Sequence, residues 1–423
     1  MVTVPLEPIL FGPFCLDRAN SRLSRDGVEL EVRPQVLHVL QVLVQNSGRY
    51  VNYEQMIQEA WSGNLVSKHT VAVTVGEAKK ALREFGPWIS YRARMGYCFE
   101  APNSDDLVRR GWHCWNRATR EGFEKGLCYF QRAARESNDP RAFEGASLCY
   151  MMMGTSGMRP AREMYQRFLE AHRRAVALRG LTPDLRADRA QGLHIFEHRH
   201  AEAEAELLQA LREKPRWAPA HLRLAMLYSG TGRLDEALEQ VEEVRAIDPL
   251  AVYLPSCEVS VRFFRRELKE ALEAARQALE LHPYLPLSRT LYAQALEFSG
   301  DLDEALEQYR VATVLSPDLP WLRVLEAVCL IHCGRSAEAS AILRQLEQLR
   351  KTEYVDAYFQ AQLLHALGRK NEAFRELERA ADENSAPMFM IDVDPRMDPL
   401  RRDPRFTSIR DRLFKDAALA VQS

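Results

Sequence analysis

The sequence of 423 residues lacks the features that mark membrane proteins and disulfide-stapled secreted proteins. No stretch approaches about eighteen uninterrupted apolar residues, and no basic N-terminal segment precedes an apolar one, so neither a membrane span nor a secretory signal is expected. The eight cysteines are scattered without a CxxC motif, which indicates reduced packing residues. These absences predict a cytoplasmic (cytosolic) protein with no membrane partner.

Motifs for common enzyme chemistry are also missing. The chain has no glycine-rich phosphate loop and no GxSxG motif. Residues His194–His200, HIFEHRH, contain the HxxEH pattern of one zinc-peptidase family, but the repeat spacing described below places His198 in a turn, where the two histidines share no helical face. Cys329 and Cys333 have no histidine at finger-like spacing and indicate helix packing. We expect no metal, no cofactor and no enzyme activity.

The chain divides into two regions of different texture. Residues 1–101 mix short strand-like pieces with three helical stretches, whereas the sequence from about residue 105 onward is helical and rich in Ala, Leu, Glu and Arg. The segment APNSDD at 101–106 predicts the boundary between them. A net charge of −2 does not exclude nucleic acid as a partner, since a small DNA-binding module can sit beside an acidic remainder.

The second region carries a regular repeat. Three residue types recur at intervals of 34 residues or multiples of 34, with Arg266 in the one slot that lacks glycine: Pro215, Pro249, Pro283 and Pro317; Ala203, Ala237, Ala271, Ala305, Ala339 and Ala373; Gly232, Gly300, Gly334 and Gly368. Alanine suits a close helix crossing, glycine a turn and proline a helix end. This period resembles the tetratricopeptide repeat. It predicts an all-α solenoid over 105–390, with about six clear and two degraded repeats, and a C-terminal tail over 391–423.

The first helices of successive repeats are expected to line a concave groove. Seven positions project inward and predict a partner-binding groove: Phe263, Phe264, Glu297, Phe298, Trp321, Tyr358 and Gln362. Aromatic side chains in such a groove would anchor a peptide or protein partner. The alternative is that several of these side chains pack between repeats.

In the first region, the segment Val66–Phe85, VSKHTVAVTVGEAKKALREF, predicts a helix. Ser67 is a good N-cap, and four apolar residues follow at core spacing: Val71, Val75, Ala78 and Leu82. Residues 9–32 predict a β-meander, two further helices precede Val66, and residues 88–100 predict a hairpin. This order indicates an α+β winged helix-turn-helix domain over residues 1–101.

Residues 9–100 resemble the C-terminal effector domain of the OmpR and PhoB response regulators. Trp61, His69-Thr70-Val71 and Gly96-Tyr97 stand where that family ends its second helix, begins its third helix and builds its wing. The sequence departs from the family at Glu77, where a basic residue is common, and at Arg94, which replaces a wing glycine. Together with the repeats, the chain resembles HilA-like bacterial regulators. CadC-like regulators share the first module but add a transmembrane helix.

The face of the third helix opposite its core positions is predicted to read base edges, with nearby basic side chains on phosphates. The predicted DNA-contacting residues are Lys68, His69, Thr70, Val73, Thr74, Glu77, Lys79, Lys80, Arg83, Arg92 and Arg94. Glu77 is expected either to accept a hydrogen bond from a cytosine amino group or to pair with a neighbouring lysine on the helix.

These observations predict a bacterial, sequence-specific transcription regulator that binds double-stranded DNA. The repeat array would serve partner binding, oligomerisation or signal sensing, with RNA polymerase or another protein as a candidate partner. The sequence leaves a homodimer open. The competing hypothesis is a scaffold or adaptor protein whose array binds partners and whose winged helix is only a docking module.

Overall fold

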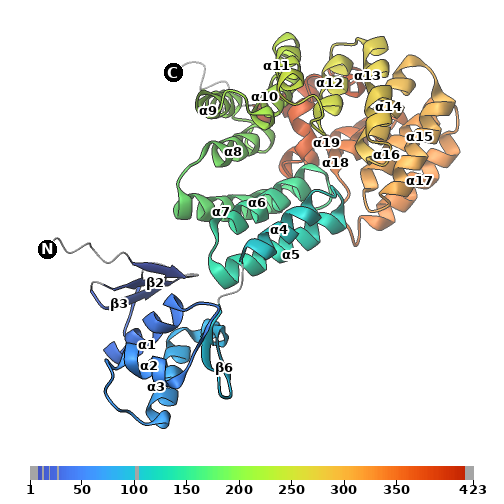
Figure 1. Ribbon diagram of the computed structural model, residues 1–423. Coiled ribbons are helices and arrows are strands. Elements are labelled where there is room, and N and C mark those ends of the chain that lie inside the picture. The colour runs from blue at the N-terminus through green and yellow to red at the C-terminus, as the bar shows by residue number, and fades with distance from the viewer. Residues whose placement is uncertain (1–7, 12–13, 19, 26–27, 101–103, 415–423) are drawn as a thin grey trace. The chain divides into compact units, whose positions relative to one another are not determined.

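A computed structural model describes residues 8–11, 14–18, 20–25, 28–100 and 104–414 (Figure 1). The chain divides into two compact units. The N-terminal unit comprises residues 1–114 and 125–145, and the array unit comprises residues 115–124 and 146–423. The predicted fold class is confirmed, because an α+β winged-helix region precedes an array of paired helices. The predicted boundary at 101–106 falls partly outside the described residues and stays a prediction.

The N-terminal unit contains two antiparallel sheets. The first has the order β1-β2-β3-β4, formed by β1 (Ile9–Phe11), β2 (Phe14–Asp17), β3 (Arg22–Arg25) and β4 (Val28–Leu30). The second has the order β5-β7-β6, formed by β5 (Tyr50–Val51), β6 (Ile89–Arg92) and β7 (Gly96–Phe99). The predicted meander and the predicted hairpin are both confirmed.

Three helices and a short 3-10 segment complete the winged-helix domain within this unit: α1 (Pro34–Gln45), α2 (Tyr53–Ala60), α3 (Lys68–Ala81) and η1 (Arg83–Trp88). Their apolar residues recur at three- and four-residue spacing, so each helix buries one face. Leu40, Met56 and Val75, one from each α-helix, share a core with the aromatic rings of Phe14 and Phe99. This core holds α3 in place.

Between residues 104 and 382, helices follow one another with short connections. Four come first: α4 (Ser104–Trp115), α5 (Arg120–Ser137), α6 (Pro140–Thr155) and α7 (Ala161–Arg179). Six pairs follow, one for each clear repeat: α8 (Pro183–Ile195) and α9 (His200–Glu213); α10 (Ala218–Gly230) and α11 (Leu234–Ile247); α12 (Leu254–Phe264) and α13 (Leu268–Leu281); α14 (Pro286–Ser299) and α15 (Leu302–Leu315); α16 (Pro320–His332) and α17 (Ser336–Leu349); α18 (Ala357–Ala366) and α19 (Lys370–Asp382). None of the described helices combines the length and the apolar character needed to cross a membrane.

The sequence period reflects packing and turn geometry. All six alanines of the 34-residue grid, from Ala203 to Ala373, are fully buried where paired helices cross. The glycines of the grid have positive φ, as at Gly300 with φ +91°. Arg266 takes the same left-handed conformation, with φ +65°, although it carries a side chain. The array therefore keeps its turn at every repeat, at some cost in backbone strain where glycine is missing.

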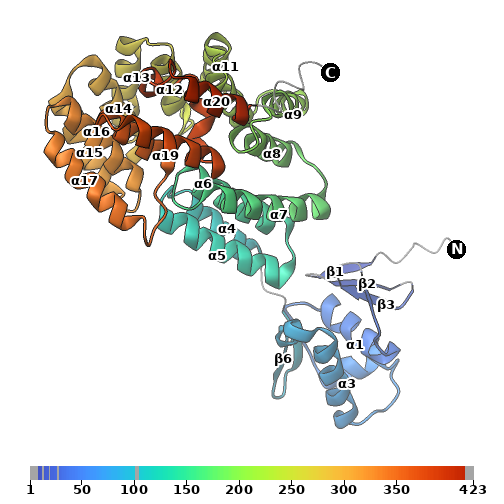
Figure 2. The ribbon, with the colours of Figure 1, turned by 180° about the vertical axis from the view of Figure 1, so that it is seen from behind.

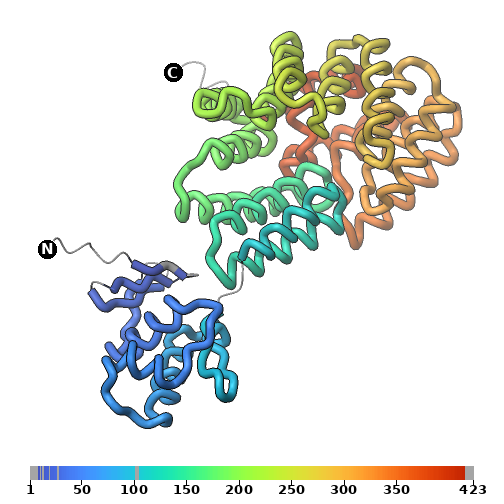
Figure 3. Tube along the Cα trace, in the orientation of Figure 1, coloured from blue at the N-terminus to red at the C-terminus, as the bar shows by residue number. Residues whose placement is uncertain are grey.

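The chain after α19 folds back onto the array (Figures 2 and 3). We call residues 386–414 the return segment; it contains η2 (Ala386–Met390), η3 (Pro395–Met397) and α20 (Pro404–Leu413). η2 packs against α8 and α10, and α20 packs against α19. Met397 and Leu400 are fully buried in one core with α18 and α19. Over its described part, the predicted C-terminal tail is thus an integral part of the array.

Arg266 is one of the residues that hold the return segment. Its Nη2 atom donates to both carboxylate oxygens of Asp398 at 2.9 Å, and its Nη1 atom donates to the carbonyl of Val393 at 3.1 Å. The repeat with Arg266 in place of a turn glycine is therefore one whose turn reaches the return segment. This contact accounts for an arginine in the left-handed conformation.

Candidate functional site

Helix α3 is fixed at its start by local hydrogen bonds and along its length by the core. The Ser67 hydroxyl accepts from the Thr70 amide at 3.1 Å, which confirms the predicted N-cap. Just before the cap, the Tyr53 hydroxyl donates to the Val66 carbonyl. All four predicted core positions are buried: Val71, Val75, Ala78 and Leu82. The opposite face of α3 consequently points away from the domain.

That outer face carries small and polar side chains. His69, Thr70, Val73 and Lys80 are exposed, with 45% of the Val73 side chain open to solvent. Ala72, which the sequence analysis did not single out, is exposed beside them. Gly76 follows one turn later, and a Cβ atom placed there would meet nothing within 4 Å. Small residues at this spacing leave the helix surface low enough for a close approach by a ligand.

The prediction that Thr74 lies on the reading face is wrong. Thr74 is only 4% exposed, and it falls at core spacing between Val71 and Ala78. Its Oγ1 atom donates to the carbonyl of Thr70 at 2.9 Å, so the buried hydroxyl is satisfied within the helix. A threonine can therefore occupy this inward position without losing its hydrogen bond.

Glu77 has a partner that the sequence did not indicate. Its Oε2 atom accepts from the Nη2 atom of Arg33, the residue that precedes α1, rather than from a lysine of α3. The pair raises the pKa of Arg33, through the hydrogen bond to Glu77 first and the charge of Glu77 second. Lys79, two residues further along the helix, is half-buried. At the edge of the outer face, the negative charge of Glu77 is therefore paired with the positive charge of Arg33.

The basic residues of the site come from the ends of α3 and from the wing, the turn between β6 and β7. Lys80 and Arg83 are exposed near the end of α3, and Lys68 at its start lies 5.7 Å from the ring centre of Tyr53. Arg92 and Arg94 are exposed on the wing. Within the part of the chain that the structure describes, the side chains of Lys80, Arg92 and Arg94 make no hydrogen bond or ion pair.

The backbone of the wing explains its unusual residue. Arg94 has φ +67°, a left-handed conformation in which glycine is unstrained. Beside it, Tyr91 is 62% exposed, although its ring lies only 5.0 Å from that of Tyr97. Tyr91 and the exposed Met95 are apolar surface that the sequence analysis missed. The wing therefore presents a basic tip with an apolar flank.

The predicted groove of the array is largely filled by the chain itself. Glu297 binds Arg396 at 2.5 Å, while Tyr358 and Gln362 both donate to the Asp394 carboxylate, at 2.7 and 3.0 Å. The return segment thus occupies these three positions, and the prediction that they are open to a partner is wrong. A long-range fold-back of this kind leaves no periodic signal in the sequence.

Of the four aromatic groove positions, which lie nearby, Phe263 is buried and so is not open to a partner as predicted, whereas the other three are half-buried. Phe263 is buried against Phe298, with ring centres 4.8 Å apart, and Phe264 is half-buried. Trp321 stacks on Phe359 at 5.3 Å, and its indole nitrogen donates to the Ser156 carbonyl at 3.0 Å. The array therefore closes on itself between α16 and the loop after α6.

The HxxEH segment forms a buried histidine cluster. His198 lies in the turn between α8 and α9 with φ +54°, as predicted from the repeat spacing. His194 Nδ1 lies 3.0 Å from His200 Nδ1, and the return segment covers the cluster through the rings of Phe389 and Phe414. The arrangement is a packing feature that joins the return segment to the first clear repeat.

This cluster should make the array acid-sensitive. Burial, helped by the neighbouring His200, lowers the pKa of His198 to about 4, and burial lowers the pKa of His200 to about 4. Histidine in an unfolded chain has a pKa near 6.5, so the unfolded state binds more protons below that pH. Stability is therefore complete above about pH 6.5 and declines as the pH falls toward 4, by on the order of 2 kcal/mol for each of these two histidines at pH 5.

Urea unfolding at pH 7 and pH 5 measures this loss. Replacing both His198 and His200 by glutamine should reduce the difference between the two pH values, whereas replacing the exposed His69 by glutamine should leave it unchanged. An equal loss in the wild type and the double variant would assign the acid sensitivity to other groups.

Taken together, these features define a class of protein: a winged-helix DNA-binding region of the OmpR/PhoB type joined to tetratricopeptide repeats. Comparisons with known proteins agree. Residues 27–99 match the family "Transcriptional regulatory protein, C terminal", and residues 196–254 match the family "Tetratricopeptide repeat". Both families are non-enzymatic in kind.

Two curated relatives each match a short part of this chain. "Transcriptional activator CadC" of Escherichia coli is a distant homologue, 25% identical over 79 residues that make up 18% of this chain and 15% of CadC. "Transcriptional regulatory protein CutR" of Streptomyces coelicolor is 34% identical over 84 residues, 19% of this chain and 39% of CutR. The match thus spans well under half of each relative. A solved structure of a monomeric IFIT1 mutant is similar in fold, with a TM-score of 0.53, 15% identity and 90% of each chain covered.

Proposed function

We propose that this chain is a sequence-specific DNA-binding transcription regulator, in which α3 enters the major groove and the wing contacts the adjacent backbone. The observation that carries the proposal is the outer face of α3. It presents His69, Thr70 and Val73 to solvent beside a lysine and two wing arginines that have no partner among the described residues. Such a regulator acts where the DNA is, which in a bacterium is the cytoplasm.

The side chains divide by chemistry into two roles. His69 and Thr70 carry hydrogen-bonding groups suited to base edges, and Val73 is suited to a thymine methyl group. Lys80, Arg92 and Arg94 are suited to phosphates, which position the protein without reading sequence. Lys68, Lys79 and Arg83 are secondary candidates for phosphate contact. The low surface at Ala72 and Gly76 favours a close approach of the helix to the base pairs.

Glu77 remains a candidate for base contact in this proposal, under a condition. A carboxylate can accept from a cytosine amino group, but the Arg33 pair must first open. That pair is at the surface, where ion pairs are weak. Thr74 is no longer included, because it is buried.

The proposal predicts a division of effects among single variants of the full chain. Lys80→Ala and Arg94→Gly should each weaken binding to all duplexes about three- to tenfold at low salt and reduce the salt slope by about one. Glycine suits the backbone at position 94, so its effect does not arise from wing distortion. His69→Ala should instead change which sequences are selected from a randomised duplex pool. Fluorescence anisotropy over a salt series, together with that selection, measures both.

Lys269→Ala provides a matched control, because Lys269 is an exposed lysine of the array. It should leave DNA affinity and the salt slope unchanged. The competing scaffold hypothesis makes a different prediction: the wild-type chain would show only weak binding without sequence preference, and Lys80→Ala would behave like Lys269→Ala. Tetratricopeptide repeats are protein-binding in kind, so under either hypothesis the array is proposed to engage a protein partner.

A further inference from the structure

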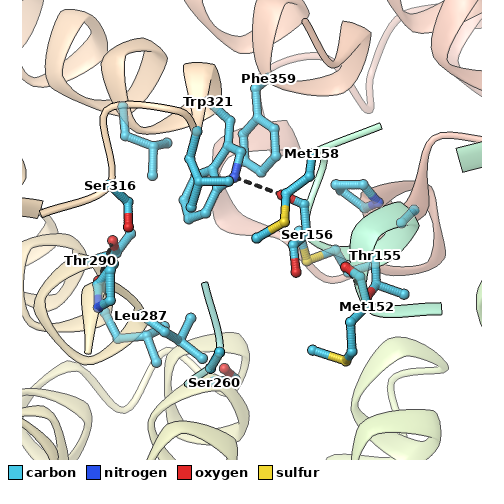
Figure 4. Close-up of a pocket in the computed structure, with 18 of the residues that line it drawn as sticks. Met152, Thr155, Ser156, Met158, Ser260, Leu287, Thr290, Ser316, Trp321 and Phe359 are labelled. Carbon is cyan, nitrogen blue, oxygen red and sulfur yellow. Dashed lines mark hydrogen bonds between the residues drawn. The ribbon is translucent and has the colours of Figure 1, made fainter. Parts of the chain in front are cut away.

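A cavity of about 430 Å³ lies inside the array unit (Figure 4). Its wall is built by segments that are far apart in the sequence: the loop after α6, helices α12, α14, α16 and α18, and the return segment. The cavity exists because the array closes on itself, through the Trp321–Ser156 hydrogen bond of 3.0 Å. Its volume falls in the range of sites that hold small organic molecules.

The lining is mostly apolar and adaptable. Methionines line the cavity together with aromatic rings, as Met152 and Met158 do with Trp321 and Phe359 in Figure 4. Methionine side chains have flexible, polarizable thioethers that fit ligands of irregular shape. Ser260 of α12 and Thr290 of α14 close the other side. A ligand in this space would bury mainly hydrocarbon surface.

Each charged side chain of the cavity lining already has a hydrogen-bond or ion-pair partner. Arg120 lies 3.3 Å from Asp318 and also donates to the Met158 carbonyl. Arg396 binds Glu297 at 2.5 Å, and the Asp394 carboxylate accepts from Tyr358, Gln362 and the Arg396 amide. A charged ligand would add an unpaired charge to a largely apolar space, which is costly. The site therefore favours a neutral molecule.

Three buried polar atoms of the lining residues make no hydrogen bond within the described structure. Gln362 lines the cavity and is 5% exposed, and its Oε1 atom makes no hydrogen bond. The orientation of the amide is fixed, because its Nε2 atom donates to Asp394, which as a carboxylate only accepts. A second lining atom, Nε of Arg396, also makes no hydrogen bond; a third, Nε of Arg120, lies 3.3 Å from Asp318 Oδ2. The first needs a donor and the second an acceptor, and a hydroxyl or amide group supplies both.

We propose that the array unit binds a neutral, mainly apolar small molecule whose hydroxyl or amide group donates to Gln362 Oε1. The return segment supplies Asp394 and Arg396 to this site, so occupancy would stabilise the closed array. The proposal concerns the array alone and stands whether or not the winged helix binds DNA.

Equilibrium dialysis of the full chain against 1-octanol tests the proposal. Three probes of similar chain length test whether binding needs a hydrogen-bond donor and a neutral ligand. Methyl octyl ether accepts hydrogen bonds but cannot donate one, octanoate is an anion, and octylamine is a cation at neutral pH. We expect saturable binding of one octanol per chain and at least tenfold weaker binding of all three other probes. Gln362→Met should bring octanol down to the affinity of the ether, because it removes the acceptor at similar volume.

Two serines give a matched pair of cavity-filling and control variants. Ser260 and Ser340 are both half-buried, and each donates from Oγ to the carbonyl four residues earlier, but only Ser260 lines the cavity. Ser260→Phe should reduce octanol binding at least tenfold, while Ser340→Phe should not change it. A cooperative thermal transition in both variants shows that they are folded. Absence of saturable octanol binding to the wild type, or equal binding by folded Ser260→Phe, would overturn the proposal.

Discussion

Replacing Gly96 by alanine is expected to unfold the winged-helix domain while leaving the array folded. Gly96 begins β7 with φ +103°, and an added Cβ atom would lie 2.0 Å from the Val51 carbonyl oxygen of the adjacent strand β5. The new methyl group would meet backbone, which has little freedom to move. Backbone strain and overpacking together should cost on the order of 3 kcal/mol or more. Thermal unfolding of the full chain, followed by circular dichroism, should show the loss of one transition, together with DNA binding.

Gly76→Ala is the matched control, because it adds the same methyl group to the same domain. Gly76 lies inside α3 with no atom within 4 Å of an added Cβ. Alanine is the better helix former, so the domain should become more stable by about 0.5–1 kcal/mol. We therefore expect Gly96→Ala to lower the stability of the winged-helix domain and Gly76→Ala to raise it. A mild effect at Gly96 would contradict the strand pairing of Val51 with Tyr97 on which the argument rests.

The parts of the fold that could be predicted from the sequence are those set by local periodicity. The core positions of α3 repeat every three or four residues, and the grid alanines repeat every 34, so both could be identified without coordinates. The cap at Ser67 was also predictable, because capping involves residues three apart. At Thr74 the prediction was wrong, because a polar residue was assumed to lie on the outer face of the helix. A hydroxyl that bonds its own helix can face inward.

Contacts between distant segments could not be predicted in this way. Arg33 and Glu77 are 44 residues apart, and Glu297 and Arg396 are 99 residues apart. No repeat relates the members of either pair. The irregular Arg266 was visible as an exception to the glycine grid, but its reason lies in Asp398, 132 residues further on. The prediction of an open groove was wrong at Glu297, Tyr358 and Gln362 for the same reason. The repeat period predicts contacts between neighbouring repeats, and the return segment is not a repeat.

The second large effect is expected at Arg396, whose replacement by methionine should destabilise the array unit by about 3–5 kcal/mol. The Arg396 side chain is 7% exposed, and its partner Glu297 is 1% exposed. Burial alone would raise the pKa of Glu297, but Arg396, with hydrogen bonds from His332 and Tyr309, holds it below its ordinary value. Without the guanidinium, the carboxylate is left buried with its main counter-charge gone. Urea unfolding of the array transition measures the loss.

A double-mutant cycle separates the loss of the ion pair from the loss of packing around Phe298, whose ring centre lies 5.1 Å from the Arg396 guanidinium. Methionine keeps much of the side-chain volume, so Arg396→Met mainly removes charge and hydrogen bonds. Glu297→Gln removes the opposite charge at nearly constant shape. If the cost of Arg396→Met comes from an uncompensated carboxylate, adding Glu297→Gln should recover part of it, giving a coupling on the order of 2 kcal/mol. Purely additive effects would mean that Arg396 stabilises the return segment by packing alone. The same cycle measured by octanol dialysis should follow the unfolding data, because Arg396 both fastens the return segment and lines the cavity.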